Sequence, residues 1–236
     1  MKIFKDLESF NVQVLINQNT VILEKFDDNI EQAKEADLLV YNLCKELDQT
    51  PYNRILFECR TEMYDQFPKI NKLLKVQGKR VVYTNTLEKL PLPHYDYDVW
   101  SVINPKSIEF LSKIMAVDYD RAEQFLEGMK QELPNQADQM FTVYVEDGQP
   151  VGVVLPHIEP NTDQEGRIFW MGVHSKFLGK GYGKILHAIS LERLRNEFNA
   201  KSYLGVTEED NKPMRNIMKA NGCEEKYTVV SYRFTI

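Results

Sequence analysis

Cysteine is scarce in this sequence, and long apolar runs are absent. Its 3 cysteines, Cys44, Cys59 and Cys223, lie far apart, and no C-x-x-C pair occurs. We interpret them as reduced thiols in the core of a cytoplasmic protein, and the sequence predicts no metal site. No stretch approaches the roughly 20 apolar residues that span a bilayer. The N-terminal segment 1–8 meets charged residues too early for a signal peptide, so we expect no membrane association.

Basic residues do not outnumber acidic residues in this sequence. The 236 residues include 29 Lys and Arg against 35 Asp and Glu, which gives a net charge of −6. Nucleic-acid-binding domains usually present a basic surface, so we expect no nucleic-acid partner, whereas a cationic amine would tolerate an acidic surface. The composition, 43% apolar and 27% charged, is ordinary for a soluble globular chain of one large or two modest domains. No feature of the sequence specifies the oligomeric state.

Glycine is concentrated in residues 171–184, the most informative segment of the chain. An apolar run ending at Val173 predicts a strand, and residues 185–198 predict a helix. Between them glycine occupies alternate positions, Gly179, Gly181 and Gly183. A strand, a glycine loop and a helix start in this order present backbone N–H groups and a helix dipole to a phosphate. Glycine also tolerates positive φ and lets a ligand approach the backbone closely.

The spacing of these glycines excludes two common phosphate-binding motifs. A dinucleotide-binding G-x-G-x-x-G requires glycine at the position of Lys184. A P-loop requires serine or threonine after Gly183-Lys184, where the chain has Ile185. An ordinary glycine-rich turn between a core strand and a core helix remains the alternative interpretation.

A second informative segment follows the predicted helix. Residues 202–206 predict a strand, and a short helix after it would begin at an Asp210 or Asn211 cap and at Pro213. Asn221-Gly222 would close this helix in a left-handed conformation. Because capping asparagines are common, the local pattern alone is equally consistent with a structural Asn211.

Together the two segments resemble the GNAT superfamily of acyl-CoA-dependent N-acetyltransferases. That family shows (Q/R)-x-x-G-x-G/A after a strand and, further on, Asn-x-x-(Ala/Met)-x-x-(Leu/Ile) ahead of a glycine. The matching positions of the second motif are Asn211, Met214, Ile217 and Gly222. The chain departs from the pattern at Leu178, Ser175 and Cys223, where the family has Gln or Arg, a proline, and an aromatic residue.

The resemblance implies an α/β fold with a mixed sheet, the GNAT acyl-CoA N-acyltransferase fold, over residues 93–236. The prolines in residues 90–94 predict the boundary, and residues 1–92 predict an additional, smaller N-terminal α/β lobe. We expect strands at 21–24, 54–58, 80–84, 98–103, 139–145 and 150–155, and helices at 29–47, 67–76, 105–115 and 120–131. The spacing of the first elements suggests a degenerate partial copy of the second domain. Residues 25–31 are acidic there, so we expect no cofactor in that lobe.

The function that the resemblance implies is transfer of an acetyl group from acetyl-CoA, as co-substrate, to a primary amine of an acceptor that the sequence does not identify. The strand would hold the pantetheine through Met171, Gly172 and Val173, and the loop would hold the pyrophosphate. The loop residues concerned are Leu178, Gly179, Lys180, Gly181, Tyr182, Gly183 and Lys184, with Asn211 and Met214 as further cofactor contacts.

The proton chemistry departs from the family. Its tyrosine acid falls on Met218, which has no proton to donate, and Arg167 stands where some relatives have a base glutamate. His174 and one acidic residue of 208–210, such as Glu208, are the candidate catalytic bases; a loop histidine and a solvated acidic loop without any role remain the alternatives. A catalytically weak acyl-CoA-binding sensor or interaction module is therefore the alternative function.

Overall fold

The computed structural model describes residues 1–17, 19–88 and 94–236. These residues form two compact units. Unit 1 comprises Met1–Val82, Val206–Asn211 and Lys226–Ile236, and unit 2 comprises Tyr83–Gly205 and Lys212–Glu225. Three long strands therefore contribute residues to both units. The domain boundary predicted after residue 92 falls within residues 89–93, which lie outside the described residues, and it stays a prediction.

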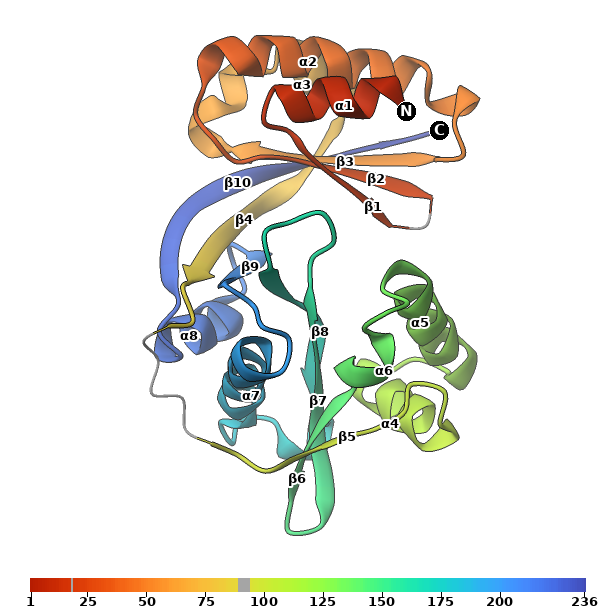
Figure 1. The fold of residues 1–236 in the computed structure, drawn as a ribbon, viewed down its shortest axis with the longest axis vertical. Coiled ribbons are helices and arrows are strands. Elements are labelled where there is room, and N and C mark those ends of the chain that lie inside the picture. The colour runs from red at the N-terminus through yellow and green to blue at the C-terminus, as the bar shows by residue number, and fades with distance from the viewer. Residues whose placement is uncertain (18, 89–93) are drawn as a thin grey trace. The chain divides into compact units, whose positions relative to one another are not determined.

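The elements in chain order are shown in Figure 1. Up to residue 88 they are α1 (Lys2–Ser9), β1 (Gln13–Asn17), β2 (Thr20–Lys25), α2 (Ile30–Lys45), η1 (Leu47–Gln49), β3 (Arg54–Arg60), η2 (Thr61–Gln66), α3 (Pro68–Leu73) and β4 (Lys75–Asn85). From residue 94 on they are β5 (Tyr97–Val99), α4 (Pro105–Met115), α5 (Tyr119–Glu132), α6 (Ala137–Met140), β6 (Thr142–Glu146), β7 (Gln149–Ile158), β8 (Glu165–Val173), η3 (Ser175–Phe177), α7 (Tyr182–Asn196), β9 (Ser202–Glu208), α8 (Lys212–Ala220) and β10 (Glu224–Thr235). Hydrogen bonds order the strands β1-β2-β3-β10-β4-β9-β8-β7-β6-β5.

Unit 1 has its own core, formed by α1, α2, α3 and one face of its strands. β2 and β3 are parallel, with Leu23 opposite Phe57, and residues 229–235 of β10 pair antiparallel with β3. α2 begins at Ile30 because the Asn29 side chain accepts the backbone N–H of Gln32 at 3.1 Å, which satisfies one of the unpaired donors of the first turn.

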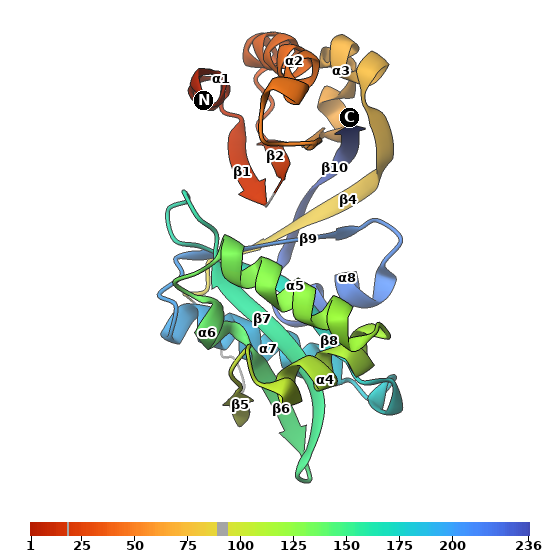
Figure 2. The same cartoon turned by 90° about the vertical axis from the view of Figure 1, so that its right-hand side faces the viewer.

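Unit 2 packs helices on both faces of the β6-β7-β8 hairpins, as Figure 2 shows for α4 and α5 on the near side and α7 behind. α4 starts at Pro105, and the Asn104 side chain caps it through Lys106 N–H at 2.9 Å. One core lies between these strands and α4 and α5. A second, smaller core lies between the strands and α7, where Leu186 and Ile189 are buried.

The predicted α/β class and the additional smaller lobe are confirmed, but several elements differ from expectation. Helix α1 and strand β1 were not predicted, because a short amphipathic segment and an edge strand give little periodic signal. The strand expected at 98–103 ends at Val99, since the chain already turns toward the α4 cap, and the start of the strand expected at 139–145 is occupied by α6. The helix expected at 67–76 stops at Leu73, where β4 takes over.

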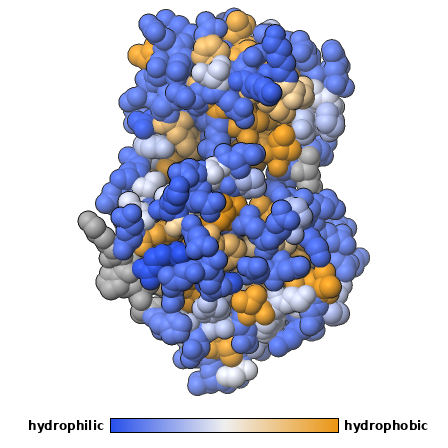
Figure 3. Space-filling model, viewed as in Figure 1, coloured by the Kyte–Doolittle hydropathy of each residue, from blue (hydrophilic) through white to orange (hydrophobic). Residues whose placement is uncertain are grey.

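Large exposed apolar side chains, such as Ile16, Val76 and Ile103, are scattered over several elements. The face in Figure 3 is mostly hydrophilic, with small hydrophobic areas between polar residues. Such scatter is normal for a protein surface. Within the described residues, no helix is both long and apolar enough to cross a membrane, and that same part of the chain contains no group of three or more His, Cys, Asp or Glu side chains placed to hold a metal ion.

Candidate active site

Strand β8 carries the predicted pantetheine contacts and contains an irregularity. Against β7, Val154 lies opposite Met171 and Pro156 lies opposite Ile168. β8 therefore has one residue more than β7 in this interval, which is a β-bulge. Bulges bend a strand and change where its side chains point.

The bulge turns two consecutive aromatic side chains to the same face of the sheet. Phe169 and Trp170 both contact Phe125 of α5, with ring centroids 5.5 Å and 6.3 Å away. Ile168 and Met171 pack instead on the α7 side. In a regular strand Phe169 and Trp170 would point to opposite faces.

Beyond the bulge, β8 has an open edge on the side of β9. The two parallel strands pair only at Glu165 with Ser202 and at Gly166 with Tyr203. Among the described residues, 168–173 are paired with a strand only on the β7 side. These residues remain partly exposed although β8 lies in the interior of the strand order. Unpaired N–H and C=O groups at such an edge can accept an extended ligand as an added strand.

The glycine loop lies directly after β8 and leads into α7. Gly179 and Gly181 have φ of +77° and +86°, values that side chains rarely adopt. A Cβ at either position would meet nothing within 4 Å, so the space in front of the loop is open. Gly181 is the N-cap of α7, and no side chain of the described residues caps this helix. The N–H groups of Tyr182 and Gly183 at the start of α7 are thus available to an anion, whereas that of Lys184 donates to Gly181 O at 3.0 Å.

Gly183 differs from the other two glycines because it lies in a contact between two helices. A Cβ there would lie 2.9 Å from Cδ1 of Ile217 on α8. Its lack of a side chain therefore allows the close approach of α7 and α8. Leu178, at the position of the family's Gln or Arg, is 64% exposed, and the ammonium of Lys180 lies 5.5 Å from the ring centroid of Phe177.

The corresponding helix start in unit 1 is already occupied by side chains of the chain itself. Asn29 caps α2, and its own backbone N–H donates to Asp27 Oδ1 at 2.9 Å. Lys25 is fully buried and forms an ion pair with Asp27. The start of α2 is therefore capped by a side chain and has acidic residues beside it, whereas the start of α7 has glycines and lysines.

His174 lies between β8 and the 3₁₀ turn η3. Its Nδ1 accepts the backbone N–H of Lys176 at 3.2 Å, so the neutral ring carries its proton on Nε2. The ring stacks on Phe110 of α4 at 6.3 Å and 17°. The lone pair that a base would use is thus engaged in a local cap.

The remaining predicted residues lie on β9, at the β9–α8 junction and on α8. Asn211 donates from Nδ2 to Thr207 Oγ1 at 3.1 Å, and Glu208 forms an ion pair with Arg80 at 3.5 Å. Both belong to unit 1, whereas Met214 on α8 belongs to unit 2 together with β8 and the glycine loop. The structure thus brings the strand and loop residues together in one unit and places Asn211 and Glu208 in the other.

Met218 is buried, with 2% of its surface exposed, and it cannot donate a proton. A neighbouring hydroxyl, that of Tyr203, lies close to it, because a Cβ on Gly205 would come within 3 Å of both Tyr203 Oη and Met218 Cε. That hydroxyl is buried and lies 3.2 Å from Nε2 of His187. It therefore serves a buried network and does not take the place of the family's tyrosine.

A cluster of buried ionisable groups, which the sequence did not single out, lies at the β7–β8 turn. His157 Nε2 lies 3.2 Å from Glu159 Oε2, and Arg167 Nε lies 2.7 Å from Glu165 and 3.7 Å from Glu159. Glu132, the last residue of α5, has a buried Oε2 without a hydrogen-bond partner. The cluster forms because His157 lies opposite Arg167 across the β7–β8 pair. The sequence alone does not give this register, so it could not have indicated the cluster.

Two of these groups, Glu132 and Glu159, line a cavity of about 390 Å³, here called the polar pocket. Its lining consists of Glu132, Leu133, Pro134, Asn135, Gln136, Ile158, Glu159, Pro160, Asn161, Thr162 and Gln164. Gln136 fixes its walls, because its side-chain amide donates to Ile158 O at 2.9 Å and accepts from Ile158 N at 2.7 Å.

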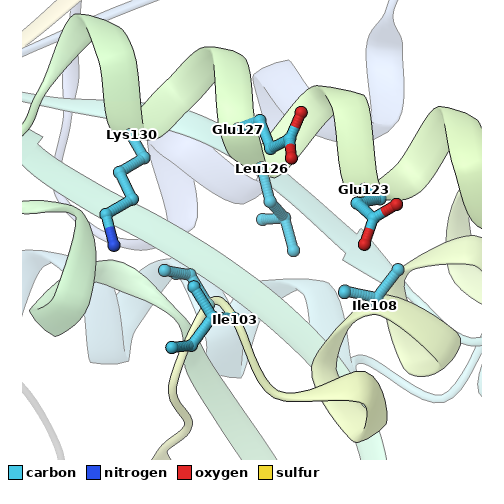
Figure 4. Close-up of a pocket in the computed structure, with 7 residues that line it drawn as sticks. Ile103, Ile108, Glu123, Leu126, Glu127 and Lys130 are labelled. Carbon is cyan, nitrogen blue, oxygen red and sulfur yellow. The ribbon is translucent and has the colours of Figure 1, made fainter.

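A second cavity, of about 250 Å³, lies between the segment before α4 and helix α5 (Figure 4). Val102, Ile108 and Leu126 form its buried floor. The charged ends of Glu123, Glu127 and Lys130 all come from α5. This cavity contains none of the predicted cofactor residues.

Burial and neighbouring charge separate the pKa values of the two carboxyls of the polar pocket. Burial, and then the negative charge of Glu159, raise the pKa of Glu132 to about 7. Burial opposes ionisation of Glu159 as well, but the hydrogen bond from His157 and the charge of Arg167 outweigh it and lower its pKa. The two carboxyls therefore differ, since ionisation is favoured at Glu159 and opposed at Glu132.

Comparison with known proteins agrees with this geometry. Residues 108–222 match the model of the acetyltransferase (GNAT) family. No curated protein matches the chain by sequence. The matched residues include β8, the glycine loop, α7 and all of α8.

Solved structures with this fold extend over almost the whole chain. A GCN5-related N-acetyltransferase from Sphaerobacter thermophilus has a TM-score of 0.59 at 14% identity, over 95% of this chain and 76% of that one. A tandem GNAT protein from the clavulanic acid biosynthesis pathway has a TM-score of 0.60 at 12% identity, over 95% and 78%. A GCN5-related N-acetyltransferase from Kribbella flavida has a TM-score of 0.59 at 10% identity, over 97% and 92%. Residues 108–222 therefore match the acetyltransferase (GNAT) family, and the chain has the GNAT fold.

Proposed function

We propose that this protein transfers an acetyl group from acetyl-CoA to a primary amine in the cytoplasm. The observation that carries the proposal is the open edge of β8 at residues 168–173, directly followed by a helix start that no side chain caps. An extended, amide-containing arm that ends in a pyrophosphate fits these two features in the order in which they occur. Coenzyme A combines them in one molecule.

The cofactor contacts are proposed as follows. The backbone of Met171, Gly172 and Val173 pairs with the pantetheine amides. The N–H groups of Gly179, Lys180, Gly181, Tyr182 and Gly183 hold the pyrophosphate, and the ammonium group of Lys184 adds positive charge beside it. Leu178, being exposed, covers apolar atoms of the cofactor rather than contacting its phosphates. Asn211 and Met214 are proposed contacts from the β9–α8 segment.

In the proposed reaction the neutral amine attacks the thioester carbonyl, the C–N bond forms, and the C–S bond then breaks. A backbone N–H of β8 stabilises the developing oxyanion. The ammonium proton passes to a base and the sulfur leaves as a thiolate. Because thiols have a pKa of about 8.5, the thiolate can leave without a side-chain acid such as tyrosine and take its proton from water.

His174 is the proposed base and Glu208 its alternative. His174 adjoins the end of β8, and freeing its Nδ1 costs one neutral hydrogen bond, about 1 kcal/mol. Glu208 would have to leave its ion pair with Arg80. The second candidate function, acyl-CoA binding without efficient catalysis, is favoured by one observation, the buried Met218 at the usual tyrosine position.

The test compares wild-type protein with Gly181→Glu in CoA binding and in acetyl-CoA-dependent thiol release with a panel of primary amines. Glu at φ of +86° and in front of the helix start should abolish binding of CoA. Gly148→Ala is the matched control, since Gly148 also has positive φ, +73°, but lies in the β6–β7 turn. Unchanged CoA affinity in a folded Gly181→Glu protein would reject the site, and CoA binding without thiol release for any amine would favour the second function.

A further inference from the structure

The polar pocket contains a carboxylate oxygen that the protein leaves unsatisfied. Oε2 of Glu132 is inaccessible to solvent and has no hydrogen-bond partner, and the same holds for Nδ1 of His157 behind Glu159. Buried polar atoms in folded proteins are almost always hydrogen-bonded, and an exception calls for an explanation such as a ligand. In the polar pocket the exception borders a cavity of about 390 Å³.

The second carboxylate of the pocket is fixed in place as an anion. Glu159 receives the hydrogen bond of His157 at 3.2 Å and the charge of Arg167 at 3.7 Å. Neither contact reaches Glu132, so the cavity has one paired carboxylate and one carboxyl whose Oε2 has no hydrogen-bond partner. The polar side chains of Asn135, Asn161, Thr162 and Gln164 complete its lining.

We propose that the polar pocket is a binding site for an organic ammonium ion, that is, the protonated form of an aliphatic primary amine. An ammonium group supplies three N–H donors and one positive charge. These suit two carboxyls and the neighbouring amide and hydroxyl oxygens. Charge-assisted hydrogen bonds of this kind are about twice as strong as neutral ones.

A bare metal ion suits the pocket less well. Calcium requires 6–8 oxygen ligands, usually with several carboxylates. The polar pocket supplies two carboxyls, and no group of three or more metal-binding side chains exists in the described ranges. Leu133, Pro134 and Ile158 also give the pocket an apolar part, which would pack against the carbon chain of an amine.

Binding at this site has a proton signature. A cation beside Glu132 favours its ionised form, so binding at pH 6 releases the proton that the raised pKa of Glu132 retains. The ionisable groups on the surrounding elements include Glu159 and His157 on and after β7, Glu165 and Arg167 on β8, and Lys130 and Asp138 on α5 and α6. Asp163 in the β7–β8 turn is paired with Lys201. Lys130 and Asp138 lie 3.8 Å apart and compensate each other.

The experiment is calorimetric titration of the full chain with 1,4-diaminobutane at pH 6, in two buffers of different ionisation enthalpy. We expect binding with proton release, no binding of the uncharged 1,4-butanediol, and affinity at least ~10-fold weaker in Glu132→Gln and Glu159→Gln. Glu123→Gln is the control, because it removes the same charge from the same helix at the other cavity. Equal affinity in all variants, or heats that do not differ between diamine and diol, would overturn the proposal.

Proton release in the wild-type protein is a readout that does not depend on how well a variant folds, and its absence would also overturn the proposal. The site does not depend on acyl transfer, so the titration is repeated without and with acetyl-CoA. If the bound diamine is acetylated, with a KM that rises in Glu132→Gln, the pocket belongs to the acceptor. If it binds but is not acetylated, the pocket is a separate amine site; both results support the proposal.

Discussion

His187 shows how a single buried side chain makes stability depend on pH. It is completely buried on α7, between Tyr203 Oη at 3.2 Å and Asn221 Nδ2 at 3.0 Å. Burial lowers its pKa from 6.5 to about 3. Asn221 also donates to Lys184 O at 2.9 Å and so connects this network with the first turn of α7.

The first prediction follows from this shift. Between pH 6.5 and about 3 the unfolded chain binds a proton on His187 that the folded chain does not. The free energy of unfolding should therefore fall as pH falls through this range, by at most about 1.4 kcal/mol per pH unit. Urea unfolding of wild type and His187→Gln at several pH values measures it, and the difference between the two should shrink toward low pH. Parallel pH dependences would contradict the assignment.

The comparison uses the difference in free energy of unfolding between wild type and His187→Gln, because Glu132 has the opposite effect on the pH dependence of stability. Its pKa is raised from 4.5 to about 7, so it stabilises the folded state below pH 4.5 and this contribution is lost as pH rises to about 7. Glu132→Gln should therefore gain stability relative to wild type at pH 7 and above. The same unfolding series gives this comparison.

A second prediction separates two roles of His174. Asparagine can accept the Lys176 N–H as a cap but cannot serve as a base, whereas alanine does neither. If His174 is the base, His174→Asn and His174→Ala should both lower kcat/KM about 10²-fold and remove the imidazole step from the pH–rate profile. Native kinetics in His174→Asn would restrict His174 to the cap that the structure shows and leave Glu208 or water as the base.

At the scale of elements, helices α2 and α7 provide an internal comparison. Each helix connects two parallel strands, β2 to β3 for α2 and β8 to β9 for α7. The side chain of Asn29 caps α2, whereas the N-cap of α7 is Gly181, and no side chain of the described residues caps that helix. A cap of this kind stabilises a helix by about 1 kcal/mol. The start of α7 lacks that contribution, so bound phosphate should stabilise it.

The third prediction is that CoA slows amide hydrogen exchange at residues 168–173 and 179–184 and leaves residues 25–33 unchanged. Added strand pairing and anion contacts protect the former, whereas at the start of α2 the N–H groups of Asn29 and Gln32 already donate to side chains of the chain itself. Exchange measured by mass spectrometry on the full chain, with and without CoA, tests it. Protection at residues 25–33 would show that unit 1 also takes up cofactor.

The glycine loop and its flanking strand and helix could be predicted from the sequence, because they depend on local periodicity and on residues with special φ. The open edge of β8 could not, since it depends on where β9 stops pairing, which no local pattern records. The same holds for the polar pocket, whose lining comes from segments 132–136 and 158–164. Asn211 could be predicted in part. Its position at the β9–α8 junction followed from the sequence, but its hydrogen bond to Thr207 did not.

At the scale of the whole molecule, the last strand is part of the unit that begins the chain. Tyr232 of β10 is fully buried in unit 1, where its hydroxyl donates to Asn71 Oδ1 at 2.7 Å and its ring lies 5.9 Å from Phe57. The fourth prediction is that Tyr232→Ala destabilises unit 1 by about 3–5 kcal/mol, as expected for removal of a buried aromatic side chain.

Faster amide exchange in residues 13–60 of Tyr232→Ala would measure this loss. Thr235→Ala, at an exposed position of the same strand, is the control and should exchange like wild type. Unchanged exchange in Tyr232→Ala would mean that unit 1 is held together without its last strand.

The division of β10 has a consequence for how the protein is made. Strand β3 has residues 229–235 as its neighbour on one side, and these leave the ribosome only after all of unit 2. While more than half of the chain is still being synthesised, the first 82 residues therefore lack the strand that pairs with β3. Such a delay exposes an unpaired strand edge to other nascent chains. We therefore expect a fragment that lacks residues 229–235 to refold with a yield that falls as its concentration rises, whereas the full chain should not show this loss. The first segment to be synthesised would then be among the last to complete its fold.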